Sequence, residues 1–141
     1  MATATAQTPA QSSGKGLRIA LWIAQVLLAL AFGASGLMKL VTPIAELAKS
    51  MPWIADMPAL IRFIGTSELL GAIGLILPSA TRVLPKLTVA AAIGLVVVMI
   101  LAAGFHFSRG EADHTPVNFV LGGVAAFIAW GRWKKAPISP R

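Results

Sequence analysis

ALIRFIGTSELLGAIGLILP, residues 59–78, combines the length and apolarity of a membrane span with two charged side chains, Arg62 and Glu68. A helix needs about 20 predominantly apolar residues to cross the hydrocarbon core of a bilayer. A carboxylate at the centre of such a helix costs roughly 2.5–3.5 kcal/mol on insertion scales. Glu68 is therefore expected to face protein or water rather than lipid, and to have a partner.

The composition extends this prediction to the whole chain. Of the 141 residues, 57% are hydrophobic and 12% are charged, whereas soluble domains have about 45–50% apolar and about 25% charged residues. Four apolar runs, separated by short polar segments, account for most of the length. The sequence therefore predicts an all-α integral membrane protein in a lipid bilayer, folded as a four-transmembrane-helix bundle around Glu68.

The apolar runs set the predicted boundaries of the bundle, which covers residues 17–133. Its spans are expected at about residues 17–41, 59–77, 84–107 and 116–130. Residues 1–16 lack apolar periodicity and are predicted to be a disordered tail, and residues 134–141 form a basic C-terminal tail. The first span begins like a signal peptide, but its length of about 25 residues favours a span that is not cleaved.

The basic residues indicate an orientation rather than a nucleic-acid partner. The net charge is +7, and one topology places most of the cations on the same side of the membrane. These cations are Lys15, Arg18, Arg82, Lys86, Arg132, Lys134, Lys135 and Arg141. Such a bias marks the cytoplasmic side. We therefore expect a multi-pass protein of the cell (inner) membrane with both termini in the cytoplasm, and no nucleic-acid binding.

Residues 42–58, TPIAELAKSMPWIADMP, are too polar and too interrupted by proline to span a membrane. Apolar side chains recur at helical spacing in Ile44, Leu47, Ala48 and Met51. This pattern predicts a short amphipathic helix at the outer surface, between the first two spans, with Trp53 at headgroup level. The alternative is a lid folded over the mouth of the bundle.

The predicted topology brings polar side chains from all four spans to the outer half of the membrane. They are Lys39, Arg62, Glu68, His106 and Asn118. We expect them to form an outward-facing polar pocket in which Glu68 is the candidate catalytic residue and the other four bind a ligand. The inner half has little polar chemistry beyond Gln25.

Each of these side chains also has a purely structural interpretation. Glu68 can form a buried ion pair with Lys39 or Arg62 that fixes the register of the helices. Arg62 and His106 suit an interfacial position, and Asn118 can hold helices together.

Several cofactors are excluded or disfavoured. The chain has no cysteine, which excludes thiol redox chemistry, cysteine-held iron–sulfur clusters and covalent c-type haem. His106 and His114 are eight residues apart, and no second membrane-embedded carboxylate completes a metal site. His106 lacks a second histidine within the spans to hold a b-type haem. We therefore expect no metal.

Three pieces of sequence resemble the DoxX-like membrane proteins. They are FGASGLMKL at residues 32–40, SELLGAIGLILP at residues 67–78, and a third span ending in His106. The resemblance covers residues 20–130 and implies a four-helix membrane bundle. Some members resemble the small subunit of a thiosulfate:quinone oxidoreductase, and others are associated with membrane redox complexes. This chain departs from such systems in having no cysteine for thiol-based links to a partner.

Three functions remain open from the sequence. The first is binding of a quinone or similar amphiphile for a redox partner protein, with Glu68 exchanging the proton. The second is a structural or assembly subunit whose buried charges lock the bundle. The third is a small transporter that works as a homo-oligomer through its small-residue faces. The residues leave open whether the chain is itself a quinone-linked oxidoreductase component.

Overall fold

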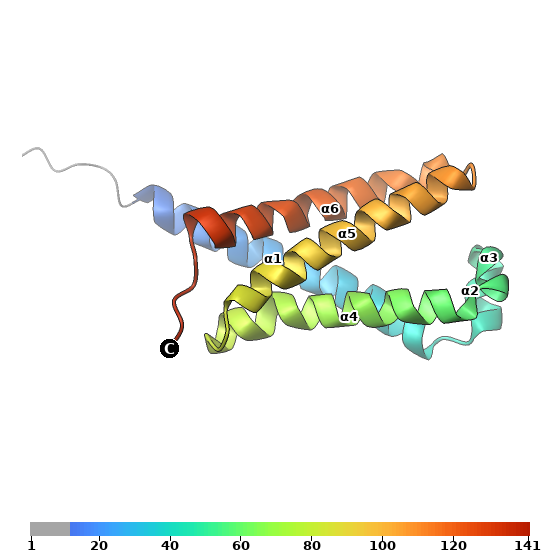
Figure 1. Cartoon of the computed structure of the whole chain (residues 1–141), viewed down its shortest axis with the longest axis horizontal. Coiled ribbons are helices and arrows are strands. Elements are labelled where there is room, and N and C mark those ends of the chain that lie inside the picture. Colours follow the sequence, from blue (N-terminus) through green and yellow to red (C-terminus); the bar gives the residue numbers. More distant parts are fainter. Residues whose placement is uncertain (1–11) are drawn as a thin grey trace, which may run out of the picture.

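The computed structural model describes residues 12–141, and these fold almost entirely into helices (Figure 1). The helices are α1 (Ser12–Val41), α2 (Ile44–Ser50), α3 (Trp53–Asp56), α4 (Pro58–Thr81), α5 (Lys86–Ser108) and α6 (Thr115–Trp130). A short 3-10 turn, Ala112–His114, precedes α6, and a π-helical turn, Gly131–Lys135, follows it. The described residues contain no strand, so the all-α prediction is confirmed.

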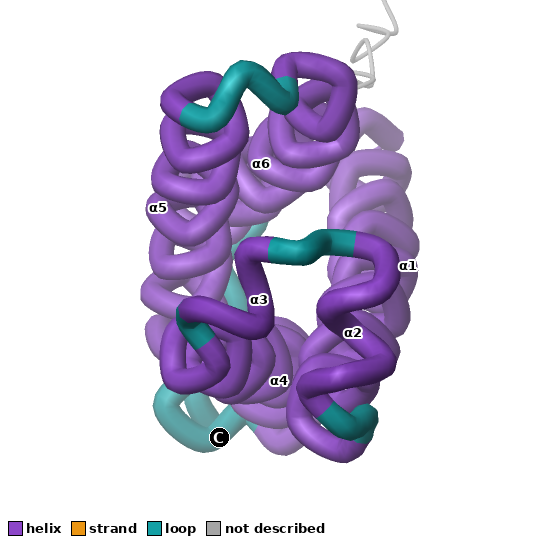
Figure 2. The backbone as a smooth tube through the Cα atoms, turned by 90° about the vertical axis from the view of Figure 1, so that its right-hand side faces the viewer, coloured by secondary structure: helices purple, strands orange, loops and turns teal. Residues whose placement is uncertain are grey.

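The four long helices form a closed ring in which α1 packs along α4, α4 along α5, α5 along α6, and α6 against α1. Figure 2 looks along this ring from the end where α2 and α3 lie in front of it. The start of α1 and the end of α6 lie together at the opposite end (Figure 1). In the same figure, α4 and α5 are close at their connecting turn and diverge toward α3.

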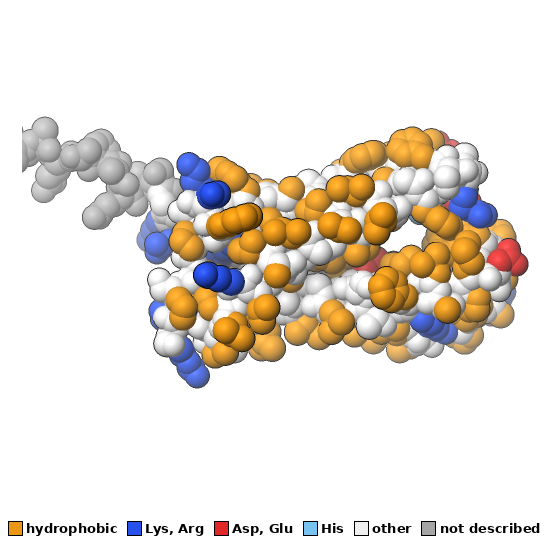
Figure 3. Space-filling model, viewed as in Figure 1, with side chains coloured by type: hydrophobic (Ala, Val, Ile, Leu, Met, Phe, Trp, Pro, Cys, Tyr) orange, Lys and Arg blue, Asp and Glu red, His pale blue; other side chains and the backbone are white. Residues whose placement is uncertain are grey.

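Three of these helices are long and apolar enough to cross a membrane, namely Gly14–Val41, Pro58–Thr81 and Lys86–Ser108. The fourth, α6, has 16 residues, a rise of about 24 Å, which is shorter than the hydrocarbon core of about 30 Å. The bundle's outward surface is rich in large apolar side chains, such as Leu30 and Leu101 at 66% and 67% exposed (Figure 3). Such a surface suits hydrocarbon rather than water.

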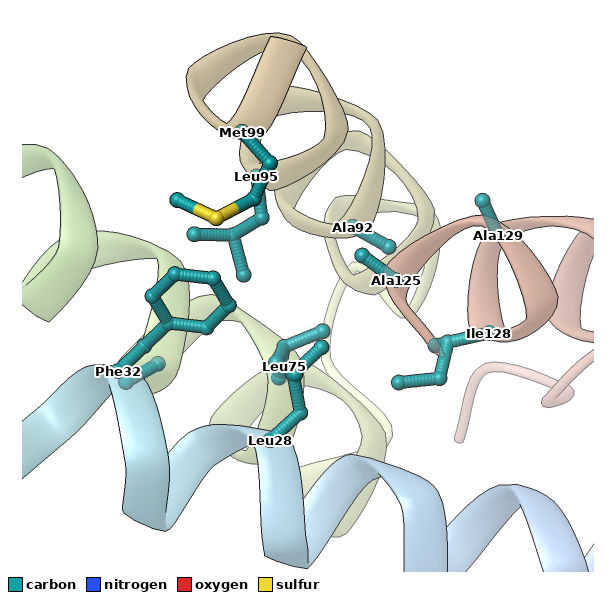
Figure 4. Packing of buried hydrophobic residues seen from close by; sticks show 10 residues of the cluster. Leu28, Phe32, Leu75, Ala92, Leu95, Met99, Ala125, Ile128 and Ala129 are labelled. Atoms are coloured by element: carbon teal, nitrogen blue, oxygen red, sulfur yellow. The ribbon is translucent and has the colours of Figure 1, made fainter. Parts of the chain in front are cut away.

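The interior is filled by side chains from all four long helices. Leu28 and Phe32 of α1, Leu75 of α4, Leu95 of α5 and Ile128 of α6 are each at most 2% exposed. Figure 4 shows these side chains pointing toward one another between the ribbons. The core therefore holds α1, α4, α5 and α6 as one bundle.

Small residues bring α1 and α4 into backbone contact. A Cβ atom added to Gly36 would lie 2.7 Å from the carbonyl oxygen of Gly65, and one added to Gly65 would lie 2.8 Å from the Cβ of Lys39. Farther along α4, a Cβ on Gly71 would clash with Leu95 of α5. These small residues of α1 and α4 are used inside the chain, whereas a Cβ on Gly94 or Gly104 of α5 would meet no atom within 4 Å.

Helix boundaries differ from the expected spans at two places. Helix α1 begins at Ser12, five residues before the expected start, while residues 1–11 of the expected disordered tail lie outside the described residues. Helix α4 continues through Pro78 to Thr81 rather than ending at the proline. Pro78 removes the amide that would bond to Gly74, and the Thr81 hydroxyl donates to the carbonyl of Leu77 at 2.7 Å. The helix makes one more turn before Arg82 ends it in a left-handed conformation.

The segment between α1 and α4 also differs from its prediction. It forms two short helices rather than one, and the Trp53 side chain is 4% exposed within the bundle. The Trp53 ring packs edge-on against Phe105 of α5 at 4.8 Å between centroids. Ile54 is fully buried beside Leu47 and Ile61. Apolar burial against α4 and α5 therefore places α3 over the open end of the bundle, as in the lid alternative.

Candidate functional site

A cavity of about 320 Å³ lies where α4 and α5 diverge, underneath α3. Figure 3 shows the molecule hollowed in this region. The polar side chains in the cavity wall are Lys39, Ser67, Glu68, His106 and Asn118, together with the indole of Trp53. Apolar side chains of α4 and α5, with Met51 between α2 and α3, form the remainder of the wall. The cavity is thus a mainly apolar chamber with a few polar groups, as is usual for small-molecule sites.

Glu68 and Lys39 form a buried ion pair in this wall. The Lys39 Nζ donates to both carboxylate oxygens of Glu68, at 2.8 and 2.7 Å, and to the Ser35 hydroxyl at 2.6 Å. The side chains are 5% exposed for Glu68 and 15% for Lys39. An ammonium group has three N–H donors, and all three are used here. The pair therefore neutralises the charge that the sequence placed in the membrane.

Arg62 takes a different role from the one expected. Its guanidinium donates to the backbone carbonyls of Lys39 and, at 2.9 Å, of Thr42. The last carbonyls of a helix have no partner within the helix, so Arg62 closes the end of α1. It is not part of the cavity wall. Arg62 thus holds the backbone of Lys39 in place rather than facing the carboxylate.

His106 connects the end of α5 to the loop that follows it. Its Nδ1 lies 2.8 Å from one oxygen of Glu111, and Arg109 donates to the other oxygen at 3.1 Å. The hydrogen bond with His106, assisted by Arg109, lowers the pKa of Glu111 below its usual value. The rings of His106 and His114 are 5.4 Å apart. The described residues contain no group of three side chains that could hold a metal ion.

Two N–H groups in the cavity wall lack a partner. The Nδ2 of Asn118 and the Nε1 of Trp53 are buried and have no hydrogen bond within the described part of the chain. Buried polar groups are nearly always paired, and an orphaned donor costs about 1–3 kcal/mol. A half-turn of the Asn118 carboxamide interchanges its oxygen and nitrogen, and in this structure the nitrogen is the buried atom without a partner.

The structure brings together four of the five predicted site residues, Lys39, Glu68, His106 and Asn118, and leaves Arg62 outside the wall. Sequence reasoning missed Ser35, although its position one helical turn before Lys39 was a usable signal. It also missed Trp53, because nothing in the local pattern indicates that the indole turns inward.

The prediction of an inner half with little polar chemistry beyond Gln25 is wrong. Gln25 donates to the carbonyl of Leu75 at 2.6 Å and to the Ser79 hydroxyl at 3.2 Å. Ser79 in turn lies 2.8 Å from the Thr88 hydroxyl. The Nε of Arg132 donates to the Gln25 carboxamide oxygen at 2.6 Å, and Arg132 is 5% exposed. The bundle therefore has a second buried polar cluster, far from the cavity.

Fold and site together define a helical membrane protein with a mainly apolar cavity, carrying a few polar groups, near one end of its bundle. A model of the DoxX-like family matches residues 23–128. The match covers most of the chain, which therefore belongs to the DoxX-like family. No curated protein and no solved structure shows a significant match.

Proposed function

We propose that the cavity binds the carbonyl-bearing head of a quinone or similar amphiphile, in the service of a membrane redox partner. The observation that carries this proposal is that two residues of one cavity wall, Trp53 and Asn118, each have a buried N–H donor without a partner. Quinone carbonyls are acceptors and have no N–H or O–H to offer. The cavity volume of about 320 Å³ falls within the range of ligand sites, about 300–1,000 Å³.

The wall also supports a ligand with an apolar tail. Phe63 of α4 and Leu101 of α5 belong to it, and they are 69% and 67% exposed on the surface of the bundle. The cavity thus reaches the surface between α4 and α5, where an isoprenoid tail can extend into lipid while the head remains inside.

In this proposal Glu68 exchanges a proton with the bound quinone. Oxidation of a quinol to a quinone releases two electrons, which the redox partner accepts, and two protons, of which the Glu68 carboxylate takes up one and solvent water the other. Since Lys39 occupies both carboxylate oxygens, proton exchange requires Lys39 to release one of them. Ser35 already holds the same ammonium group, so it can retain Lys39 during that movement.

We further propose that α6 is the fourth span. The protein then lies in the inner membrane of the cell, with both of its termini in the cytoplasm. The antiparallel packing of α6 on α5 supports this topology, as does the π-helical turn to Lys135 that extends the helix. The cavity then opens near the outer face, and Arg132, Lys134 and Lys135 lie on the cytoplasmic side, in accordance with the positive-inside rule.

One observation favours a second candidate, a structural subunit without a ligand. Lys39 and Glu68 compensate each other's charge, and the Ser35 hydroxyl accepts the third hydrogen bond of the Lys39 ammonium group. The pair therefore needs no ligand. In that case the pair fixes the register of α1 against α4.

The quinone proposal predicts the effect of Asn118→Leu, which removes the orphaned amide at nearly constant volume. We expect the purified variant to bind a short-chain quinone about tenfold more weakly than wild type, because it loses one buried hydrogen bond. Binding is followed in detergent by quenching of tryptophan fluorescence. The control is Phe119→Leu, since Phe119 is the next residue along α6 and is 61% exposed. Failure of wild type to bind, or equal binding by Asn118→Leu, would favour the structural subunit.

A further inference from the structure

A second cavity, of about 460 Å³, lies at the opposite end of the molecule, between the start of α5 and the C-terminal segment. Most of its wall is apolar, including Val89 and Ile93 of α5 and Ile138 of the C-terminal segment. Two cations, Lys86 and Arg132, share the wall with Trp133. Lys86 and Trp133 are exposed, and Ile93 is 44% exposed on the bundle surface. We call this site the basic groove.

Arg132 is the unusual member of the basic groove. Its Nε bonds to Gln25 and its Nη1 contacts the carbonyl of Ala136 at 3.4 Å, but its Nη2 is buried without a partner in the described chain. Its guanidinium also lies over the ring of Trp22, 5.3 Å from the centroid. All of these partners are neutral, so a buried cation at this site lacks an anion.

The chain itself has no acidic side chain to supply that anion. Its five carboxylates lie in α2, α3, the outer cavity and the loop after α5: Glu46, Asp56, Glu68, Glu111 and Asp113. Those elements lie toward the end of the bundle away from the basic groove (Figure 1). In Figure 3 the basic side chains crowd the end of the bundle that holds the groove.

We propose that the basic groove binds one anionic phospholipid, whose phosphate pairs with Arg132 and Lys86 and whose acyl chain lies along Val89 and Ile93. A guanidinium prefers a phosphate, with which it can form two parallel hydrogen bonds. Trp133 beside the groove suits the headgroup level of a bilayer. The combination of an apolar wall and two cations fits an amphiphile better than a free ion.

The Nη2 of Arg132 is buried, so pairing with the phosphate requires the groove to widen by a movement of the C-terminal segment that forms one of its walls. That segment is attached to Arg82 at the turn between α4 and α5. The Nε of Arg82 donates to the carbonyl of Ser139 at 2.9 Å, and the amide of Arg141 donates to the carbonyl of Arg82 at 3.3 Å. Both contacts are on exposed residues, where water readily replaces them. The groove can therefore widen by a shift of a weakly held segment rather than of a packed helix.

The test is native mass spectrometry of the full chain, released from nanodiscs that contain phosphatidylcholine and phosphatidylglycerol with identical acyl chains. We expect wild type to retain phosphatidylglycerol preferentially. Lys86→Gln is expected to lower this retention about fivefold, the effect of one basic residue near an anionic headgroup. Lys15→Gln is the matched control, because Lys15 is an exposed cation at the same end but outside the groove wall. Arg132→Gln is expected to abolish the preference.

The outcomes separate the sources of the phosphate. The melting temperature of wild type is also measured with inorganic phosphate and with phosphatidylglycerol. An equal rise with both would overturn the lipid assignment in favour of a free anion. Equal losses of phosphatidylglycerol retention in Lys86→Gln and Lys15→Gln would overturn the assignment of the lipid to the basic groove, because retention would then depend only on the total charge. Since Lys86 is exposed and its replacement leaves the core intact, this comparison holds even if Arg132→Gln fails to fold.

Discussion

Replacing Lys39 with methionine is expected to destabilise the protein by about 3–5 kcal/mol, because the change leaves Glu68 as a buried charge without its partner. The ammonium group supplies both hydrogen bonds that the Glu68 carboxylate makes in the described structure. Glu68 is 4% exposed as a residue, so water reaching it through the cavity can replace those bonds only in part. Methionine keeps much of the side-chain volume of lysine. The lost stability therefore measures the effect of removing the positive charge.

A second variant separates the charge from the packing. Glu68→Gln introduced together with Lys39→Met removes the orphaned charge, and we expect the double variant to regain a large part of the lost stability. The free energy of unfolding is measured in mixed detergent micelles by the loss of helical circular dichroism. If Lys39→Met alone has the same free energy of unfolding as wild type, the ion pair with Lys39 is not what stabilises the charge of Glu68 in the membrane.

Gly36→Ala is expected to destabilise the bundle by about 1–3 kcal/mol through overpacking. The new Cβ would lie 2.7 Å from the Gly65 carbonyl oxygen and 2.8 Å from the Leu69 amide nitrogen. Both are backbone atoms, so no side chain can rotate away and α1 must separate from α4. The same Cβ would lie 3.2 Å from the Cβ of Glu68, and the separation therefore also loosens the ion pair.

Gly94→Ala is the control for this effect. No atom outside its own helix backbone and chain neighbours lies within 4 Å of a Cβ at Gly94. Alanine is the better helix former by about 1 kcal/mol, so Gly94→Ala should be neutral or slightly stabilising. Both variants are compared by thermal unfolding in the same detergent. Equal effects at the two positions would show that backbone contact between α1 and α4 does not limit stability.

Much of the fold follows from local features of the sequence. Apolar runs of membrane length, with Pro58 and Pro116 in the first turns of α4 and α6, indicate where the long helices lie. Glu68 required a buried partner on energetic grounds, and Lys39 near the end of the preceding span was one of two candidates. Hydropathy and the cost of a buried charge are properties of single segments, which explains why these predictions succeeded.

The misplaced features depend on contacts between distant segments. Arg132 and Gln25 are 107 residues apart, and Arg132 alone looks like an ordinary cation of the cytoplasmic tail. From the sequence, Arg62 could face Glu68 or the end of α1, and in the structure it donates to the carbonyls of Lys39 and Thr42. Trp53 turns inward because Phe105 offers it a ring to pack against. None of these partners can be identified from a local pattern.

Mass spectrometry of the small molecules extracted from the purified protein tests the proposed function most directly. Wild type and Asn118→Leu are produced in the same cells, matched for folded fraction by size-exclusion chromatography, and extracted in parallel. We predict a quinone or another carbonyl-bearing amphiphile in stoichiometric amount with wild type, and its loss from Asn118→Leu but not from Phe119→Leu. Ordinary phospholipid alone in all three samples would contradict the account and assign the cavity to a structural subunit.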